Sequence, residues 1–351
     1  MLTLPSGKAE VCKISMSVFD SRSQLYFFLD VRYLGTYIWS KKEVPMQFKV
    51  FQSSDTNVKK YVFEWSKDES PTFKPTKAAI AEAVLYRYGS YSERTVICCS
   101  VMSGCPVGCT FCGTGKFFVR NLTADEIVQQ VDTAISDSVL KDTCTECIKK
   151  FQIMFMSMGE PLMNYYNLEC AIKRLHEKYP NAALLVSTSA PTAGMPFITE
   201  LIKLSQQIDK VGLQFSVHES TDENRAKLIP TKTCTLRQIA AMGNMWAAFV
   251  GRKPFYNYCV HEGNNTAEDA QRLVELFDPK VWETTLSVIC SKDESVAASI
   301  DRQLGVIDKF KTELLNRGVS LRVFNPAGQD DIGGGCGQLW YFQEWLKTNN
   351  K

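Results

Sequence analysis

The chain has 351 residues, of which 45% are hydrophobic and 22% charged, and its formal net charge is +2. This composition is typical of a globular protein with a sizeable core, and it excludes a strong overall basic field while leaving room for local basic patches. No apolar run reaches the roughly 18 residues that span a bilayer, and the opening stretch MLTLPSGKAEVCK lacks an apolar signal segment. We therefore expect a cytoplasmic protein that does not enter a membrane.

The first 95 residues are rich in strand-forming residues. Aromatic and β-branched side chains fill the stretches 24–39, 46–52 and 59–65, with turn-forming residues between them. The stretch KAAIAEAVLYRY (77–88) fits a helix or a strand equally well. We expect a small strand-rich N-terminal domain over residues 1–80.

From residue 96 onward, short strands alternate with longer helices. TVICCSV (95–101) and KFQIMFMSM (150–158) have the apolar composition of buried parallel strands. Between them, Thr123 and Glu126 have the spacing of a capping box, which predicts that a helix begins there. Further strands are expected at 182–189, 210–218, 254–261, 283–290 and 319–325, and helices at 167–179, 197–208, 235–250, 267–277 and 299–317.

About six βα units in one stretch predict an α/β fold with a curved parallel sheet, which is a full or, more simply, a partial (β/α) barrel over residues 81–351. In such barrels the chemistry lies at the carboxyl ends of the strands. Polar or special residues follow the predicted strands here repeatedly: the loop after residue 101, Gly159-Glu160-Pro161, Ser187-Thr188-Ser189 and Ser216-Val217-His218.

Thirteen cysteines argue for metal binding or catalysis, because the cytosol keeps thiols reduced and disfavours a disulfide scaffold. Cys105, Cys109 and Cys112 form a C-x3-C-x2-C loop, whose three thiols suit a four-iron cluster with one open iron. A structural zinc site normally has four ligands, and three incidental core cysteines are the remaining alternative. The pair Cys144 and Cys147 is either incidental or a local metal clip.

Several long motifs resemble one enzyme family in order and in sequence. They include CCSVMSGCPVGCTFCGTGK, FFVRNLTADEIVQQV, MSMGEPLMNY, VSTSAPTAG, FSVHESTDENRAKLIPTK and QDDIGGGCGQL, between about residues 80 and 345. This stretch is similar to the radical S-adenosylmethionine methyltransferases of the RlmN/Cfr family, which methylate carbon 2 or carbon 8 of adenosine in RNA. The resemblance implies a radical-SAM barrel in which Cys105, Cys109 and Cys112 hold a [4Fe–4S] cluster that binds S-adenosylmethionine. Residues 1–80 have no counterpart that we identify in that family.

The resemblance also implies catalytic roles for three residues. Cys336 corresponds to the methyl carrier. One S-adenosylmethionine methylates its sulfur, and the radical from a second removes a hydrogen atom from that S-methyl group. Cys98 corresponds to the resolving thiol that releases the product through a transient disulfide. Glu82 corresponds to the base that takes the proton from the substrate carbon, although a solvated surface glutamate is the alternative. Cys99 would point to the opposite face of its strand as a small core residue.

The cofactor contacts implied by the family fall on the strand ends. Gly159, Glu160, Ser187, Ser216, Val217 and His218 correspond to residues that bind S-adenosylmethionine, while a lone His218 would otherwise be read as structural. The family's asparagine near the penultimate strand is replaced by Cys290 or Ser291. Lys116 and Arg120 fit either phosphate contacts or a solvated face.

We expect a radical methyltransferase that acts on an sp2 carbon, most simply adenine carbon 2 or 8 in rRNA or tRNA. Two alternatives remain: the same chemistry on a nucleotide, DNA, a small molecule or a protein, and a non-catalytic iron–sulfur module. The expected cofactors are the [4Fe–4S] cluster and two molecules of S-adenosylmethionine per turnover. The expected partners are an RNA substrate and an external one-electron reductant such as flavodoxin or ferredoxin, and the protein is expected to be monomeric.

Overall fold

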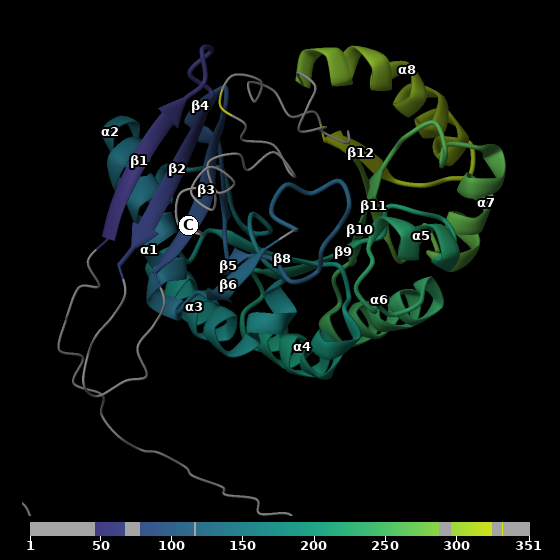
Figure 1. Cartoon of the computed structure of the whole chain (residues 1–351), viewed down its shortest axis with the longest axis horizontal. Coiled ribbons are helices and arrows are strands. Elements are labelled where there is room, and N and C mark those ends of the chain that lie inside the picture. Colours follow the sequence, from purple (N-terminus) through teal and green to yellow (C-terminus); the bar gives the residue numbers. More distant parts are fainter. Residues whose placement is uncertain (1–45, 67–77, 116, 288–295, 325–331, 333–351) are drawn as a thin grey trace, which may run out of the picture. The chain divides into compact units, whose positions relative to one another are not determined.

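A single ten-stranded sheet organises the chain in the computed structural model (Figure 1), which describes residues 46–66, 78–115, 117–287, 296–324 and 332. Four strands at one side are antiparallel: β1 (Met46–Gln52), β2 (Val58–Trp65), β3 (Ala79–Tyr88) and β4 (Ser90–Cys99). From β4 the sheet continues as parallel strands: β7 (Lys150–Phe155), β8 (Ala183–Thr188), β9 (Val211–Ser216), β10 (Phe255–Cys259), β11 (Glu283–Ser287) and β12 (Leu321–Phe324). The predicted α/β class and partial barrel are therefore confirmed.

Helices connect the parallel strands and follow one another along the outer side of the curved sheet (Figure 1). They are α1 (Ala124–Ala134), α2 (Leu140–Asp142), α3 (Tyr165–Lys178), α4 (Ile198–Gln207), α5 (Asp222–Leu228), α6 (Leu236–Val250), α7 (Ala267–Leu276) and α8 (Val296–Leu315). Short 3-10 or π segments are η1 (Ile135–Val139), η2 (Thr145–Cys147), η3 (Pro161–Asn164) and η4 (Thr192–Phe197). No helix in the described ranges is long and apolar enough to cross a membrane.

Local sequence signals explain where these helices begin. Thr123 and Glu126 form the predicted capping box at α1, in which the Thr123 hydroxyl accepts from the Glu126 amide and the Glu126 carboxylate accepts from the Thr123 amide. Thr235 and Gln238 make the same arrangement at α6, which ends at Gly251 in the left-handed conformation. These signals act within a single turn, so they were readable without tertiary information.

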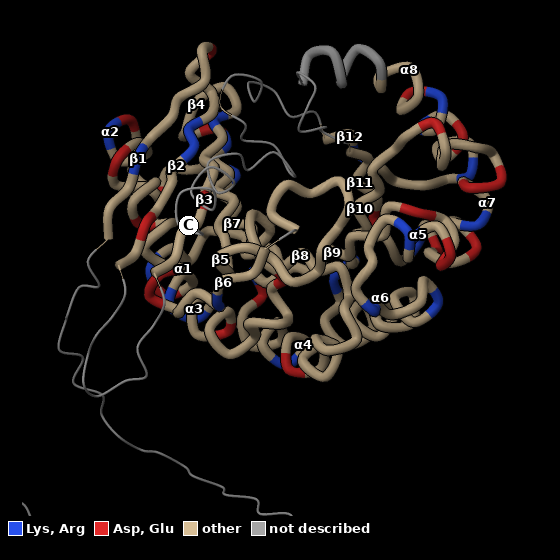
Figure 2. The backbone as a smooth tube through the Cα atoms, in the orientation of Figure 1, with Lys and Arg blue, Asp and Glu red and all other residues tan. Residues whose placement is uncertain are grey.

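The outer helices carry both signs of charge. Figure 2 shows acidic and basic residues side by side on α3, α4 and α7, and several of them form ion pairs one helical turn apart. The exposed pairs on α3 and α4 contribute little to stability, typically below about 1 kcal/mol each. Neither sign forms a continuous face on these three helices.

The two faces of the antiparallel strands have different surroundings. On one face of β2, the Tyr61 hydroxyl bonds Ser138 of η1 and the Trp65 indole bonds Gln129 of α1, so this face packs on the helices within the main core. The opposite face carries a smaller cluster, which we call the inner cluster. It consists of Val58, Val84, Tyr86 and Val96, against which Tyr88, Cys98, Met154 and Ile332 pack.

The strand-rich character of the N-terminal region is present where the structure describes it, over β1, β2 and β3. These strands do not form a sheet of their own but extend the barrel sheet by antiparallel pairing with β4. The boundary that we predicted at residue 80 lies within β3, and the compact unit begins at Glu43. The predicted strand at 24–39 lies outside the described residues.

Candidate active site

The cysteine loop lies between two short strands, β5 (Met102–Gly104) and β6 (Phe118–Asn121). The loop closes on itself through bonds from the Cys105 amide to the Phe117 carbonyl (2.7 Å) and from the Cys112 amide to the Cys109 carbonyl (3.1 Å). It docks on the segment after β9, because the Thr231 hydroxyl bonds the Val107 carbonyl at 2.6 Å. The loop is therefore held against the carboxyl end of the parallel sheet.

The three thiols of this loop are partly buried. Burial raises the pKa of Cys105 to about 12, and the Cys112 sulfur lies 3.1 Å from the Thr114 hydroxyl. Within the described part of the chain, no three His, Cys, Asp or Glu side chains are grouped as ligands of one metal, so the three sulfurs do not converge on a common point. The donor set fits an iron–sulfur cluster in its chemistry, but convergence requires these side chains to turn toward one another.

Gly159 and Glu160 follow β7 and lie close to the cysteine loop. Gly159 has φ +95°, and a Cβ there would meet the Met102 side chain at 2.5 Å, so only glycine fits. The buried Glu160 carboxylate accepts four hydrogen bonds, from the Leu162 amide, the Thr188 hydroxyl, and the amide and hydroxyl of Ser189. Burial raises the pKa of Glu160, while these bonds oppose the shift. Glu160 thus joins the ends of β7 and β8.

Ser187 and the Ser216-Val217-His218 segment occupy the neighbouring strand ends. The Ser187 hydroxyl accepts a bond from the Gln214 amide group at 3.2 Å, and Ser216 ends β9. The backbone amides of Val217 and His218 both donate to the Asn257 carbonyl on β10. The predicted cofactor-binding residues therefore lie on three adjacent strand ends.

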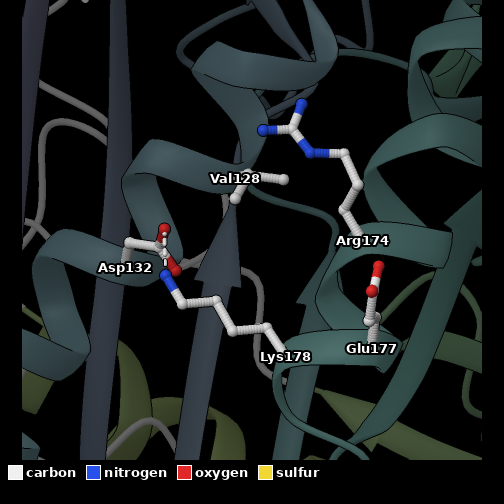
Figure 3. Close-up of a pocket in the computed structure, with 5 residues that line it drawn as sticks. All are labelled: Val128, Asp132, Arg174, Glu177 and Lys178. Atoms are coloured by element: carbon white, nitrogen blue, oxygen red, sulfur yellow. Dashed lines mark hydrogen bonds and ion pairs between the residues drawn. The ribbon is translucent and has the colours of Figure 1, made fainter. Parts of the chain in front are cut away.

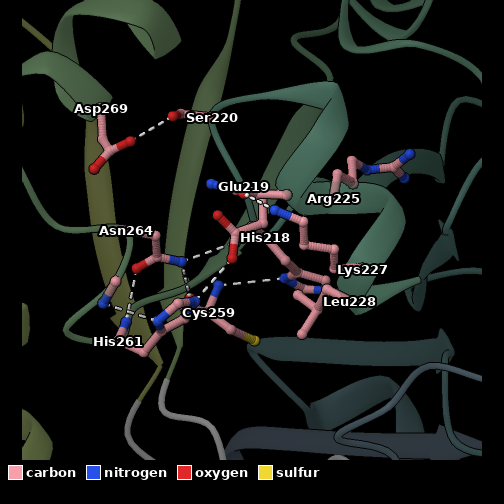
Figure 4. Close-up of polar contacts among 12 residues, drawn as sticks. His218, Glu219, Ser220, Arg225, Lys227, Leu228, Cys259, His261, Asn264 and Asp269 are labelled. Atoms are coloured by element: carbon pink, nitrogen blue, oxygen red, sulfur yellow. Dashed lines mark hydrogen bonds and ion pairs between the residues drawn. The ribbon is translucent and has the colours of Figure 1, made fainter. Parts of the chain in front are cut away.

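His218 is a buried, neutral imidazole (Figure 4). Its Nδ1 accepts from the Cys259 amide at 3.2 Å, which leaves the ring proton on Nε2. Burial, with the nearby Arg225 cation, lowers the pKa of His218 to about 3. Its backbone has φ +61°, and its ring meets the Phe111 ring of the cysteine loop edge-on at 5.4 Å. His218 therefore connects the end of β9 with the cysteine loop.

Arg225 on α5 is a central residue of this region that the sequence reasoning missed. Its buried guanidinium donates to four carbonyls and one hydroxyl: Ser189, Ser216, Val217 and Cys234 O, and Thr233 Oγ1. Desolvation lowers the pKa of Arg225 to about 10. A charged residue on a short helix looks solvent-exposed in sequence, so periodicity offered no signal for this role.

A second missed pair, Glu219 and His261, borders His218 (Figure 4). His261 Nε2 lies 2.8 Å from the buried Glu219 carboxylate, and His261 Nδ1 accepts from the Gly263 amide at 3.0 Å. Because Nδ1 is an acceptor, the hydrogen between the two side chains lies on Nε2 in the neutral ring. This pair fixes the loop after β10.

The catalytic residues predicted on β3 and β4 lie on the inner face. Val84 pairs in register with both Lys60 of β2 and Cys98 of β4, so these side chains share one face, and Glu82 shares it because it lies two residues from Val84. Glu82 is fully buried, so the alternative of a solvated surface glutamate is wrong. Cys99 points into the main core on the other face, in agreement with the strand alternation.

Several predictions fall outside the described residues or have a different outcome. Cys336, Lys116, Cys290 and Ser291 lie outside them. Arg120 forms a paired contact with Glu126, at 2.6 and 2.8 Å. Cys144 and Cys147 form a disulfide, so in this state they are not zinc ligands and the metal-clip alternative is not supported.

A surface cavity of about 380 Å³ lies elsewhere, between α1 and α3 (Figure 3). Its lining is Val128, Asp132, Arg174, Glu177 and Lys178, and the Lys178 ammonium pairs with the Asp132 carboxylate at 2.7 Å. None of the predicted site residues contributes to it. We therefore do not assign the active site to this cavity.

No protein-family model matches the chain. A protein of Pseudothermotoga lettingae described as "Probable dual-specificity RNA methyltransferase RlmN" is 31% identical over 302 residues, which cover 85% of this chain and 80% of the relative. The Dictyoglomus turgidum protein of the same description is 30% identical over 300 residues, which cover 85% and 79%. This coverage exceeds residues 80–345, so the similarity extends beyond the stretch that carries the motifs.

A solved structure agrees with these relatives. The crystal structure of a radical SAM methyltransferase from Sphaerobacter thermophilus matches with a TM-score of 0.66 and 25% identity, and the match covers 84% of this chain and 81% of that one. Both the sequence relatives and this structural match cover most of the two chains. The chain therefore belongs to the RlmN/Cfr-like family and is a radical S-adenosylmethionine methyltransferase.

Proposed function

We propose that this enzyme methylates an sp2 carbon in RNA, adenine carbon 2 or 8 in rRNA or tRNA, with Cys336 as the methyl carrier. The observation that carries the proposal is the position of Ile332, which packs on the inner cluster together with Cys98. Cys336 follows Ile332 by four residues, and four residues of extended chain span at most about 14 Å. This short separation in sequence supports a carrier that approaches the proposed resolving thiol.

The RNA part of the proposal rests on the relatives, whose descriptions name RNA methyltransferases. The near-neutral net charge means that affinity for RNA depends on local contacts rather than on an overall basic field. Lys116 is proposed as part of this contact surface, whereas the Arg120 guanidinium is engaged by the Glu126 carboxylate.

Cys105, Cys109 and Cys112 would hold the cluster, and Gly159, Glu160, Ser187, Ser216, Val217 and His218 would bind S-adenosylmethionine at the strand ends. Bound together, these groups would supply the methyl group, the removal of one hydrogen atom from the methyl carbon on the Cys336 sulfur and the exchange of one electron with the adduct. The buried neutral His218 and the filled hydrogen-bond set of Glu160 keep the strand ends fixed while the cofactor changes.

The remaining steps belong to the chain's own residues. Once the methylene carbon on Cys336 is bonded to the substrate carbon, Glu82 takes the proton that this carbon loses. Cys98 then gives up its thiol proton and its sulfur bonds to the Cys336 sulfur. The bond between that sulfur and the methylene carbon breaks, its electron pair goes to the carbon, and the carbon takes up one proton to become the methyl group of the released product. The resulting disulfide is returned to two thiols by an external dithiol reductant.

The test starts from reconstituted protein with S-adenosylmethionine and a one-electron reductant. Mass spectrometry should find one methyl group on Cys336, and the absence of that methyl group with an intact cluster overturns the proposal. With total RNA from cells lacking the protein, Cys98→Ala should accumulate a covalent protein–RNA adduct.

The matched control is Cys99→Ala, because the neighbouring thiol lies on the opposite face in the main core. This variant should release methylated RNA normally. Normal release by Cys98→Ala would remove Cys98 from the mechanism, and methyl groups found on protein or small molecules instead of RNA would reassign the substrate.

A further inference from the structure

Lys60 and Glu82 form a buried ion pair on the inner face of the sheet. The Lys60 ammonium lies 3.2 Å from Glu82 Oε2, and the two side chains are 3% and 0% exposed. The same ammonium lies 5.6 Å from the centre of the Phe51 ring on β1. The Phe51 ring, Lys60 and Glu82 thus come from three neighbouring strands of the sheet, β1, β2 and β3 (Figure 1).

The pair lies beside the proposed resolving thiol. Lys60, Val84, Cys98 and Met154 form one row of register partners across β2, β3, β4 and β7. Glu82 is the diagonal neighbour of both Lys60 and Cys98, a relation that places residues about 7–8 Å apart. The pair therefore faces the same space as Cys98 and the inner cluster.

The backbone of Glu82 is fixed at the active end of the sheet. Its carbonyl accepts hydrogen bonds from the hydroxyls of Ser100 and Ser157, both at 2.7 Å, and its amide lies 3.3 Å from the Met158 sulfur. Ser100 directly follows β4, and Ser157 and Met158 follow β7. These contacts hold Glu82 at the carboxyl ends of the first two parallel strands.

The contribution of this ion pair to folding stability does not by itself explain why two charged side chains are buried here. A buried ion pair is often no more stabilising than well-packed apolar side chains of similar volume, because both charges lose their hydration. The rest of the inner cluster is apolar, so an apolar pair would suit the packing. A carboxylate that is kept ionised without water, in contrast, is what a base at this position requires.

We propose that Lys60 is a positioning residue that keeps Glu82 ionised and aimed into the space beside Cys98, so that Glu82 accepts the substrate proton. This inference rests on the proposed function. In the step, the substrate C–H bond breaks, its electron pair stays on the substrate carbon, and Glu82 changes from carboxylate to carboxylic acid. Lys60 takes no part in the proton transfer.

By strand alternation, several charged or titratable groups besides Lys60 and Glu82 belong to this face: Lys49 of β1, Glu64 of β2, Tyr86 and Tyr88 of β3, and Arg94 and Cys98 of β4. Of these groups, Lys49 pairs with Glu64 at 3.7 Å and Arg94 donates to Gln152 at 3.2 Å, whereas the Lys60 ammonium lies 3.2 Å from the Glu82 carboxylate. Removing the Lys60 cation therefore takes away the ammonium that lies 3.2 Å from Glu82 Oε2. Under these conditions the carboxylate becomes harder to ionise.

The test compares three substitutions in single-turnover methyl transfer to total RNA from cells lacking the protein. Lys60→Met should lower the transfer rate at neutral pH by at least about tenfold and move the acidic limb of the pH profile to higher pH. Lys60→Arg, which keeps the charge, should retain most of the rate and the original profile. Lys59→Met is the matched control, because Lys59 lies on the opposite face and bonds Ser138 at 2.8 Å; it should behave as the unchanged protein.

The first half-reaction separates this inference from the proposed function. Methylation of Cys336 does not involve Glu82. Mass spectrometry should therefore find the same amount of methylated Cys336 in all variants. If unchanged protein gains no methyl group on Cys336, the proposed function fails. If unchanged protein does gain this methyl group, the role of Lys60 can be judged separately. Transfer by Lys60→Met at the normal rate and with the normal pH profile would then overturn that role.

A double variant covers the case in which Lys60→Met does not fold. Lys60→Met combined with Glu82→Gln removes both charges and should fold, with a transfer rate equal to that of Glu82→Gln alone, because Lys60 acts only through Glu82. A further loss in the double variant, relative to Glu82→Gln, would show that Lys60 acts independently of Glu82 and would contradict the proposal.

Discussion

The antiparallel and parallel regions of the sheet carry their polar residues in different places. In the parallel region, the buried polar side chains Glu160, Ser187 and His218 lie at or just beyond the carboxyl ends of strands. In the antiparallel region, Lys60 and Glu82 lie within strands, on the face opposite the helices. The difference follows from topology, because parallel strands bring equivalent ends to one edge, whereas antiparallel strands alternate their ends.

The residues of the site are held in position in two different ways. The strand ends of the parallel region are joined by side chains that bond backbone groups, chiefly Glu160 and Arg225. The antiparallel region presents its functional groups from a regular ladder, in which the strand pairing itself fixes their positions. Substitutions in the two regions should therefore have different effects on the protein.

The largest expected effect concerns Arg225 in the parallel region. Arg225→Met leaves four buried carbonyls without their donor, and we expect it to lower the free energy of unfolding by about 3–5 kcal/mol, measured by urea denaturation. Lys227→Met on the same helix is the control, because Lys227 forms an exposed pair with Glu223, and its effect should stay within about 0.5 kcal/mol. Equal effects of the two substitutions would show that Arg225 does not hold the strand ends together.

A smaller effect is expected for Cys98 in the antiparallel region, and it depends on pH. Burial raises the pKa of the Cys98 thiol from 9.0 to about 12, so between these values the folded protein retains a proton that the unfolded chain releases. Stability from this group is thus complete below pH 9 and is lost as pH rises toward 12, by up to about 1.4 kcal/mol per pH unit.

The measurement compares unchanged protein with Cys98→Ala by urea denaturation between pH 8 and 11. The difference in the free energy of unfolding between the two proteins should be constant up to about pH 9 and then shift in favour of Cys98→Ala. Cys99 is present in both proteins, so its own titration cancels. Parallel pH curves up to pH 11 would show that the Cys98 thiol is solvated rather than buried.

The smallest expected effect concerns the contact between the cysteine loop and β9. Phe111→Ala removes the edge-on contact with His218, which is worth about 0.5–1.5 kcal/mol beyond the apolar area. Amide hydrogen exchange should become faster in residues 105–115, while the exchange of β2 and β3 stays unchanged. Faster exchange throughout the sheet would mean that this contact supports the whole fold rather than the loop.

The secondary structure and the positions of the site residues could be predicted from the sequence to different extents in the two regions. The capping box at Thr123 and the apolar strands before Gly159 and Ser187 rely on local patterns, and the structure confirms the helix and the strands. The burial of Glu82 was not predictable, because 77–88 fitted a helix or a strand equally well and the face of a strand depends on its partners. Arg225 was missed for a related reason, since its bonding partners lie 8 to 36 residues away in sequence.

The sequence by itself determined the alternation of strands and helices, the cysteine spacing of the loop and the family of the enzyme, because each of these is written in short stretches of neighbouring residues. Only the tertiary structure decided that Lys60 meets Glu82 and that Cys98 and Ile332 pack on one inner cluster. Those relations depend on strand register, and a shift of one residue would turn each of these side chains to the opposite face. The register is set by the packing of the whole sheet rather than by any one segment.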